Sequence, residues 1–292
     1  MKSTYLALAL ISALLQEPGP WRVVFEQDKK LGSVREDGTD RREEPGPPPG
    51  FEVPSPDGKR LLYIEDSNED EEIWVKDANG ENRRKLSSRH EVDGLPAWTP
   101  DGKRVVFTAV RGGSCQVWIM DADGAHLTRL TTHEGGARNP KVSPRGDRIA
   151  YREIIASREK LPPSTVRLID PAGGNSTAIL ERTQVLEFAW SPTGDRLACS
   201  LVGELRILDV PSGKTAHTFT FAEISKQLHA HAAYGVVWRP DGAALACTIH
   251  FLGGRMLGTK LYGDDQLFIL PLKGKPVTVE MKGPAGPVRW IR

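Results

Sequence analysis

The sequence is poor in the features that would place it in several large classes of protein. It has three cysteines, an odd number that forms no disulfide framework. Its 39 Lys and Arg nearly balance its 38 Asp and Glu, so no overall charge draws it to nucleic acid or to an anionic membrane. It has no Gly-x-Ser-x-Gly and no His-Glu-x-x-His motif. We therefore predict no nucleic-acid partner and assign no catalytic residues.

Long apolar runs are also scarce. One apolar-biased run, from Tyr5 to Leu15, is too short to cross a bilayer but suits the apolar region of a secretory signal. We predict a signal segment over residues 1–18, with a cut after Ala13 as one plausible site; the alternative is a buried first strand. The protein is then expected to be periplasmic or secreted, to have no membrane span, and to form a single domain over residues 19–292.

One turn motif occurs five times in the sequence. The copies begin with a Ser, Thr or Arg followed by Pro, and their prolines are separated by 44, 44, 48 and 48 residues. Pro at the second position and Asp and Gly after it are typical of a type I turn. The five copies are SPDGK (55–59), TPDGK (99–103), SPRGD (143–147), SPTGD (191–195) and RPDGA (239–243).

Each turn begins a similar run of strands. A β-rich run follows it, then in four copies a strand that ends in Asp, then a second turn and a last strand. Trp98, Trp190 and Trp238 stand two residues before the turn proline, where they would pack in the core. Four strands in each unit of 44 to 48 residues, with no helix between them, predict an all-β protein: a β-propeller of four-stranded antiparallel blades.

The two ends of the chain predict a sixth blade. Trp290 continues the spacing of the repeated tryptophans, so the C-terminal PVRWIR should form the innermost strand of one more blade. Its remaining strands are expected near the N-terminus, in WRVVFEQ (21–27) and GSVREDGTDRREE (32–44). We therefore predict a six-bladed propeller whose closing blade is built from both termini, which protects open sheet edges.

The Pro-Asp-Gly-Lys turns and the Leu-Thr-Thr-His run at 130–133 resemble TolB-type propeller repeats, which are similar in layout to WD repeats. The resemblance covers about residues 20–292. It implies the propeller fold and is much less specific for function, because this repeat serves many roles. The chain departs from TolB itself, which carries an α/β domain before its propeller.

Loop lengths predict which face binds a ligand. The loops that join the second and third strands differ most between repeats, and they should share one face with the connections between blades. Several histidines and basic residues belong to that face. The candidate ligand-binding residues are His90, His133, Arg138, His231, His250, Arg255, Lys260 and Asp264.

Two functions of different classes remain open. The leading hypothesis is an exported, monomeric, non-enzymatic propeller that binds a protein or glycan and needs no cofactor. The alternative is a metal-assisted lyase or hydrolase acting on an acidic polysaccharide, because imidazole is the commonest metal ligand. His90, His133 and His231 are the candidate ligands of such a divalent metal, although histidines at loop ends often serve only as hydrogen-bonding groups.

Overall fold

In the computed structural model the described residues form a chain of strands that separates into two compact units. Unit 1 comprises Met1–Pro48, Leu186–Asp209 and Thr215–Arg292, and unit 2 comprises Pro49–Val185 and Val210–Lys214. The prediction of one domain over residues 19–292 stays a prediction. The structure describes residues 21–27, 30–44, 52–67, 70–87, 96–158, 162–224, 230–251, 256–257, 260–261, 266–280 and 285–291.

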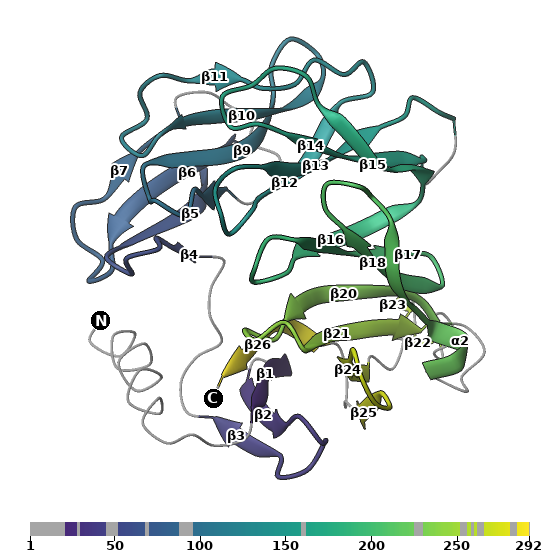
Figure 1. The fold of residues 1–292 in the computed structure, drawn as a ribbon. Helices are drawn as coiled ribbons and strands as arrows, with labels where there is room; N and C mark the ends of the chain where they lie inside the picture. The colour runs from purple at the N-terminus through teal and green to yellow at the C-terminus, as the bar shows by residue number, and fades with distance from the viewer. Residues whose placement is uncertain are drawn as a thin grey trace. The chain divides into compact units, whose positions relative to one another are not determined.

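Unit 2 contains three four-stranded antiparallel sheets, which are blades 1 to 3 (Figure 1). Blade 1 consists of β4 (Val53–Pro54), β5 (Arg60–Ser67), β6 (Asp70–Asp77) and β7 (Arg84–Lys85). Blade 2 consists of β8 (Ala97–Trp98), β9 (Arg104–Val110), β10 (Cys115–Asp121) and β11 (Thr128–Arg129). Blade 3 consists of β12 (Ala137–Val142), β13 (Ile149–Ile154), β14 (Ser164–Ile169) and β15 (Thr177–Thr183).

Unit 1 contains the other three blades. Blade 4 consists of β16 (Val185–Trp190), β17 (Arg196–Leu201), β18 (Glu204–Asp209) and β19 (Thr215–Thr220), followed by the short helix α2 (Phe221–Ile224). Blade 5 consists of β20 (Ala230–Trp238), β21 (Ala244–Phe251), β24 (Gln266–Pro271) and β25 (Val277–Glu280); a hairpin of β22 (Met256–Leu257) and β23 (Lys260–Leu261) lies between β21 and β24. Blade 6 consists of β26 (Ala285–Ile291), β1 (Arg22–Gln27), β2 (Lys30–Arg35) and β3 (Arg42–Glu44).

The sixth blade confirms the prediction from the two ends of the chain. β26 pairs antiparallel with β1, with Trp290 opposite Val23 and Val288 opposite Phe25. The strand order is β26-β1-β2-β3, so one C-terminal strand completes three N-terminal ones (Figure 1). The fold is thus a six-bladed β-propeller with four antiparallel strands in each blade.

The repeated turn follows from the chemistry of its own side chains. In the first copy, the Gly58 amide donates to the Ser55 carbonyl at 2.8 Å, and Gly58 has a left-handed φ of 69°. The Ser55 hydroxyl donates to Asp57 at 2.6 Å and accepts from the Arg60 amide at 2.9 Å, so it joins both ends of the turn. Such local bonds need no partner from elsewhere in the fold, so the turn can be recognised from the sequence alone.

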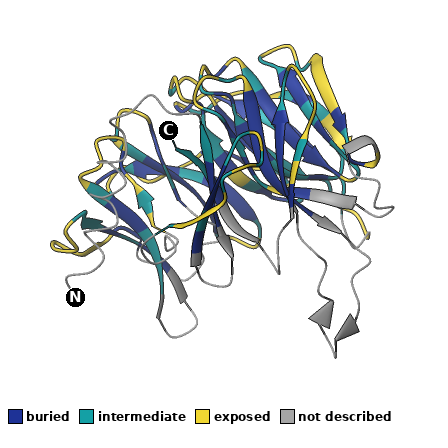
Figure 2. Cartoon of the chain, turned by 90° about the horizontal axis from the view of Figure 1, so that it is seen from below, coloured by how far each residue is buried: buried dark blue, intermediate teal, exposed yellow. Residues whose placement is uncertain are grey.

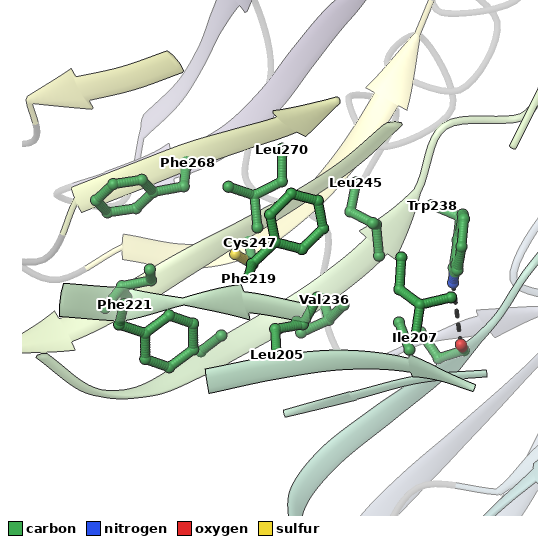
Figure 3. Close-up of a cluster of buried hydrophobic side chains, with 14 residues drawn as sticks. Leu205, Ile207, Phe219, Phe221, Val236, Trp238, Leu245, Cys247, Phe268 and Leu270 are labelled. Carbon is green, nitrogen blue, oxygen red and sulfur yellow. Dashed lines mark hydrogen bonds between the residues drawn. The ribbon is translucent and has the colours of Figure 1, made fainter. Parts of the chain in front are cut away.

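Neighbouring blades within each unit pack face to face. Buried residues follow the central strands, and exposed residues gather at turns and outer strands (Figure 2). Blades 4 and 5, for example, share a cluster that includes Leu205, Phe219, Phe221, Leu245 and Phe268 (Figure 3). Cys199 and Cys247 are fully buried, and burial raises the pKa of the Cys199 thiol to about 12. They are packing groups in the core.

Two of the repeated tryptophans also tie a blade to the one before it. The Trp238 indole Nε1 donates to the Ala189 carbonyl at 3.0 Å (Figure 3, dashed line), and the Trp98 indole donates to the Val53 carbonyl at 3.1 Å. Trp98 and Trp238 are 7% and 8% exposed, which agrees with core packing. A buried indole N–H needs an acceptor, and the preceding blade supplies one at the equivalent position.

Two second-turn glycines of unit 2 lie in close contact with main-chain carbonyl oxygens. Gly213 has a φ of 70°, and a Cβ built there would lie 2.4 Å from the Ile179 carbonyl oxygen. At Gly124 the equivalent distance, to the Leu86 carbonyl oxygen, is 3.0 Å. These two turns therefore leave no room for a side chain at the glycine, whereas a Cβ at Gly174 or Gly274 would meet no atom closer than 3.8 Å. None of the described helices is long and apolar enough to cross a membrane.

Candidate binding site

The variable loops of unit 2 gather at the opposite end of its sheets, which we call the loop end. It comprises the β9–β10 loop (111–114), the connection from blade 2 to blade 3 (130–136), and the described parts of the β13–β14 loop (155–158 and 162–163). The Ile154 amide donates to the Gly136 carbonyl at 2.9 Å, so the connection lies against the β13–β14 loop. The Gln116 side chain, fully buried, donates from Nε2 to the His133 carbonyl at 2.6 Å. This confirms the prediction that the variable loops share an end with the connection between blades.

Two glycines allow the connection to approach its neighbours closely. A Cβ at position 135 would lie 2.0 Å from the Ile154 carbonyl oxygen. A Cβ at position 136 would lie 2.9 Å from the Cys115 carbonyl oxygen, and Gly136 has a φ of 92°. Only glycine fits both places without moving the backbone. The loop end is therefore held rigidly by the blades on either side of it.

Both imidazole nitrogens of His133, a predicted ligand-binding residue, have partners within unit 2. Its Nε2 lies 2.8 Å from the Tyr151 hydroxyl, and its Nδ1 lies 3.1 Å from Glu153 Oε1. Burial lowers the pKa of His133, while the nearby Glu153 carboxylate acts in the opposite direction. A neutral imidazole that donates from Nδ1 and accepts at Nε2 fits this arrangement. A metal at His133 would have to displace Tyr151 or Glu153.

The other members of this network are bonded to one another as well. Arg167 on β14 forms an ion pair with Glu153, and its Nη1 donates to the Ser176 hydroxyl at 3.1 Å. Tyr151 is fully buried, and burial raises the pKa of its phenol. Each polar group thus has its partner inside unit 2, and the network fastens the connection between blades 2 and 3 to blade 3. This agrees with the structural role that histidines at loop ends often have.

Arg138, the second predicted residue that can be placed, lies in a group of three cations on one face of blade 3. Arg138 on β12 is directly opposite Arg152 on β13, and Lys141 is opposite Ala150. Two residues of β12 therefore stand opposite Tyr151 alone, which is a β-bulge, and Asn139 within it has a left-handed φ of 54°. Because side chains alternate along a strand, residues 138 and 141 would otherwise point to opposite faces. The bulge places Arg138, Lys141 and Arg152 on the same face.

The cost of this arrangement is visible in Arg152. Burial lowers the pKa of its guanidinium, and the positive charge of Arg138 lowers it further. Arg152 Nη1 donates to the Val185 carbonyl at 2.7 Å, which holds the side chain at the start of β16. Like charges placed directly opposite on neighbouring strands destabilise a sheet. The three cations are all partly buried, so solvent screens them less than it would an exposed cluster.

Cations at these positions vary between blades: blade 6 has Arg289 at the position of Lys141, and burial lowers the pKa of that guanidinium too. Blade 5 has the same bulge, with Tyr234 opposite Thr248 and Val237 opposite Ala246, and Gly235 there has a φ of 61°. Neutral residues occupy the positions equivalent to Arg138, Lys141 and Arg152 wherever the structure describes them in blades 2, 4 and 5. These residues are Ala97 and Thr108 in blade 2, Leu186, Ala189 and Ser200 in blade 4, and Tyr234, Val237 and Thr248 in blade 5.

The remaining predicted site residues cannot be placed in the same detail. His90, Arg255 and Asp264 lie outside the described residues, and His231, His250 and Lys260 belong to β20, β21 and β23 with side chains that are not described. In the described part of the chain, no group of three or more His, Cys, Asp or Glu is placed to hold a metal ion. The sequence interpretation missed Lys141, Arg152 and Glu153. A comparison of the repeats position by position would have found the first two.

Comparisons with known proteins agree with this fold. Residues 38–162 match the family of the TolB β-propeller domain. No curated protein matches the chain. Among solved structures, the chain is similar to TolB from Acinetobacter baumannii, with 18% identity, coverage of 98% of this chain and 71% of that one, and a TM-score of 0.61.

Two further structures are similar at the level of the fold alone. One is an oligogalacturonate lyase from Vibrio parahaemolyticus, with 14% identity, coverage of 79% and 64% of the two chains, and a TM-score of 0.58. The other is the β-propeller domain of the Trilobed protease from Pyrococcus furiosus, with 13% identity, coverage of 91% and 83%, and a TM-score of 0.57. The shared fold identifies this chain as a β-propeller protein, of which residues 38–162 match the TolB β-propeller domain.

Proposed function

We propose that this chain is an exported, non-enzymatic binding protein that holds a protein or glycan partner at its loop end. The observation that carries the proposal is the contrast between the two ends of the sheets. At one end, the repeated five-residue turn keeps the same length and the same glycine hydrogen bond in all five copies. At the other, the loop lengths vary freely on a rigid scaffold, which is the usual arrangement of a binding face.

The lengths of three hairpin loops show this freedom. The loop has four residues (111–114) between the paired Val110 and Cys115, and nine (155–163) between the paired Ile154 and Ser164. It has two residues (202–203) between Leu201 and Glu204 in blade 4. Blades of the same architecture thus carry very different loops, so these loops are not needed to make a blade.

The short loop of blade 4 provides the matched replacement for a test. Residues 155–163 of blade 3 are replaced by Val-Gly, the residues that join β17 to β18. We expect this variant to keep the melting temperature and circular dichroism of the wild type, because its hairpin remains. A partner cross-linked to the wild-type protein in its native host should be lost from the variant when the cross-linked species are quantified by mass spectrometry.

The control changes the opposite end of the sheets. Lys273 and Lys275 are exposed in the turn between β24 and β25, and K273S/K275S should retain the partner. If the partner stays with the loop variant and is lost from K273S/K275S, the binding face has been assigned to the wrong end.

Export is part of the proposal and has its own test. It is supported by the apolar run from Tyr5 to Leu15, which has the length of a signal's apolar region. Mass determination of the protein recovered from the periplasm or medium should show a shortened N-terminus, with a cut after Ala13 as the expected site. An intact Met1 on protein that remains in the cytoplasm would contradict export.

The second candidate, a metal-assisted lyase or hydrolase of an acidic polysaccharide, is favoured by one observation. Arg138, Lys141 and Arg152 form a cationic face that would attract an acidic chain. Metal analysis of protein purified without an affinity tag tests this candidate. Stoichiometric Mn, Zn or Ca would favour the enzyme, and substitution of His90 and His231 should then remove the metal.

A further inference from the structure

We draw no further inference here: the strongest candidate, the outer edge of β19 in blade 4, a six-residue strand without Lys, Arg, Asp or Glu that pairs only with β18 among the described strands, carries no proposal because nothing in the structure shows what covers that edge.

Discussion

The indole Nε1 of Trp290 donates a hydrogen bond to the main-chain carbonyl of Val237 at 3.3 Å. Trp290 belongs to β26, whose other neighbour is β1 from the N-terminal part of the chain. One strand therefore links blade 5 to the three N-terminal strands of blade 6. The same bond joins Trp238 to Ala189 in blades 5 and 4, so the closing blade uses the ordinary contact of the repeat.

Deleting residues 287–292 should therefore remove cooperative unfolding, although a deletion of six residues from an ordinary tail costs little. The deletion leaves the edge of β1 unpaired and removes Trp290, whose loss alone is expected to cost about 3–5 kcal/mol. Urea denaturation, monitored by circular dichroism rather than by tryptophan fluorescence, measures the effect. W290F loses the hydrogen bond but keeps an aromatic group. Its free energy of unfolding should therefore be only about 1 kcal/mol below that of wild type. An unchanged transition in the deletion variant would contradict the two-ended blade.

Gly213 and Gly58 form a matched pair for testing how the turns are held. Their φ angles are 70° and 69°, but only Gly213 has a carbonyl oxygen, that of Ile179, 2.4 Å from an added Cβ. G58A should cost about 1–2 kcal/mol, the usual penalty of a left-handed alanine. G213A should cost more than that, because the backbone of blade 3 must also move. Equal losses of unfolding free energy in the two variants would mean that the contact at Ile179 is easily relieved.

His133 and His126 should affect the pH dependence of stability in opposite directions. Burial lowers the pKa of His133 below its usual 6.5, so in mild acid the unfolded chain binds more protons and folding weakens as the pH falls. The hydrogen bond to Asp121 raises the pKa of His126, so its stabilisation is present below 6.5 and is lost as the pH rises. H133Q should reduce the loss of stability between about pH 7.5 and about pH 5, and H126Q should increase it.

Chemical unfolding of the two variants at both pH values measures this contrast. His126 is largely exposed, so salt should weaken its effect more than that of His133. If wild type and H133Q lose equal stability on acidification, Glu153 offsets the effect of burial on the pKa of His133.

Arg138 and Arg152 should differ in what they contribute to the ligand-free protein. R138Q removes one of two like charges on opposite strands, so the free energy of unfolding should stay level or rise by about 0.2–1 kcal/mol at low salt. R152T also removes the donor to the Val185 carbonyl and should lose about 0.5–1.5 kcal/mol. Denaturant titration compares the two. If R138Q is as destabilising as R152T, Arg138 is a structural cation.

Local chemistry explains which features were predicted correctly from the sequence. The turn at Ser55–Gly58 is closed by its own hydroxyl, carboxylate and glycine, so five residues suffice to specify it. Its repetition, with a tryptophan two residues before each of several copies, determines the number of blades and the two-ended sixth blade. Both follow from spacing, which needs no knowledge of side-chain directions.

The candidate site depended on contacts between distant residues. His133 resembled a free loop histidine in the sequence, yet Tyr151 and Glu153, 18 and 20 residues later, occupy both of its nitrogens. Lys141 stands three residues after Arg138, a spacing that simple alternation assigns to opposite faces of a strand. The pairing of β12 with β13 inserts a bulge and brings both residues together with Arg152. Turn and repeat are local properties of the chain, whereas the face on which a charge lies depends on strand register, which forms only when the sheet does.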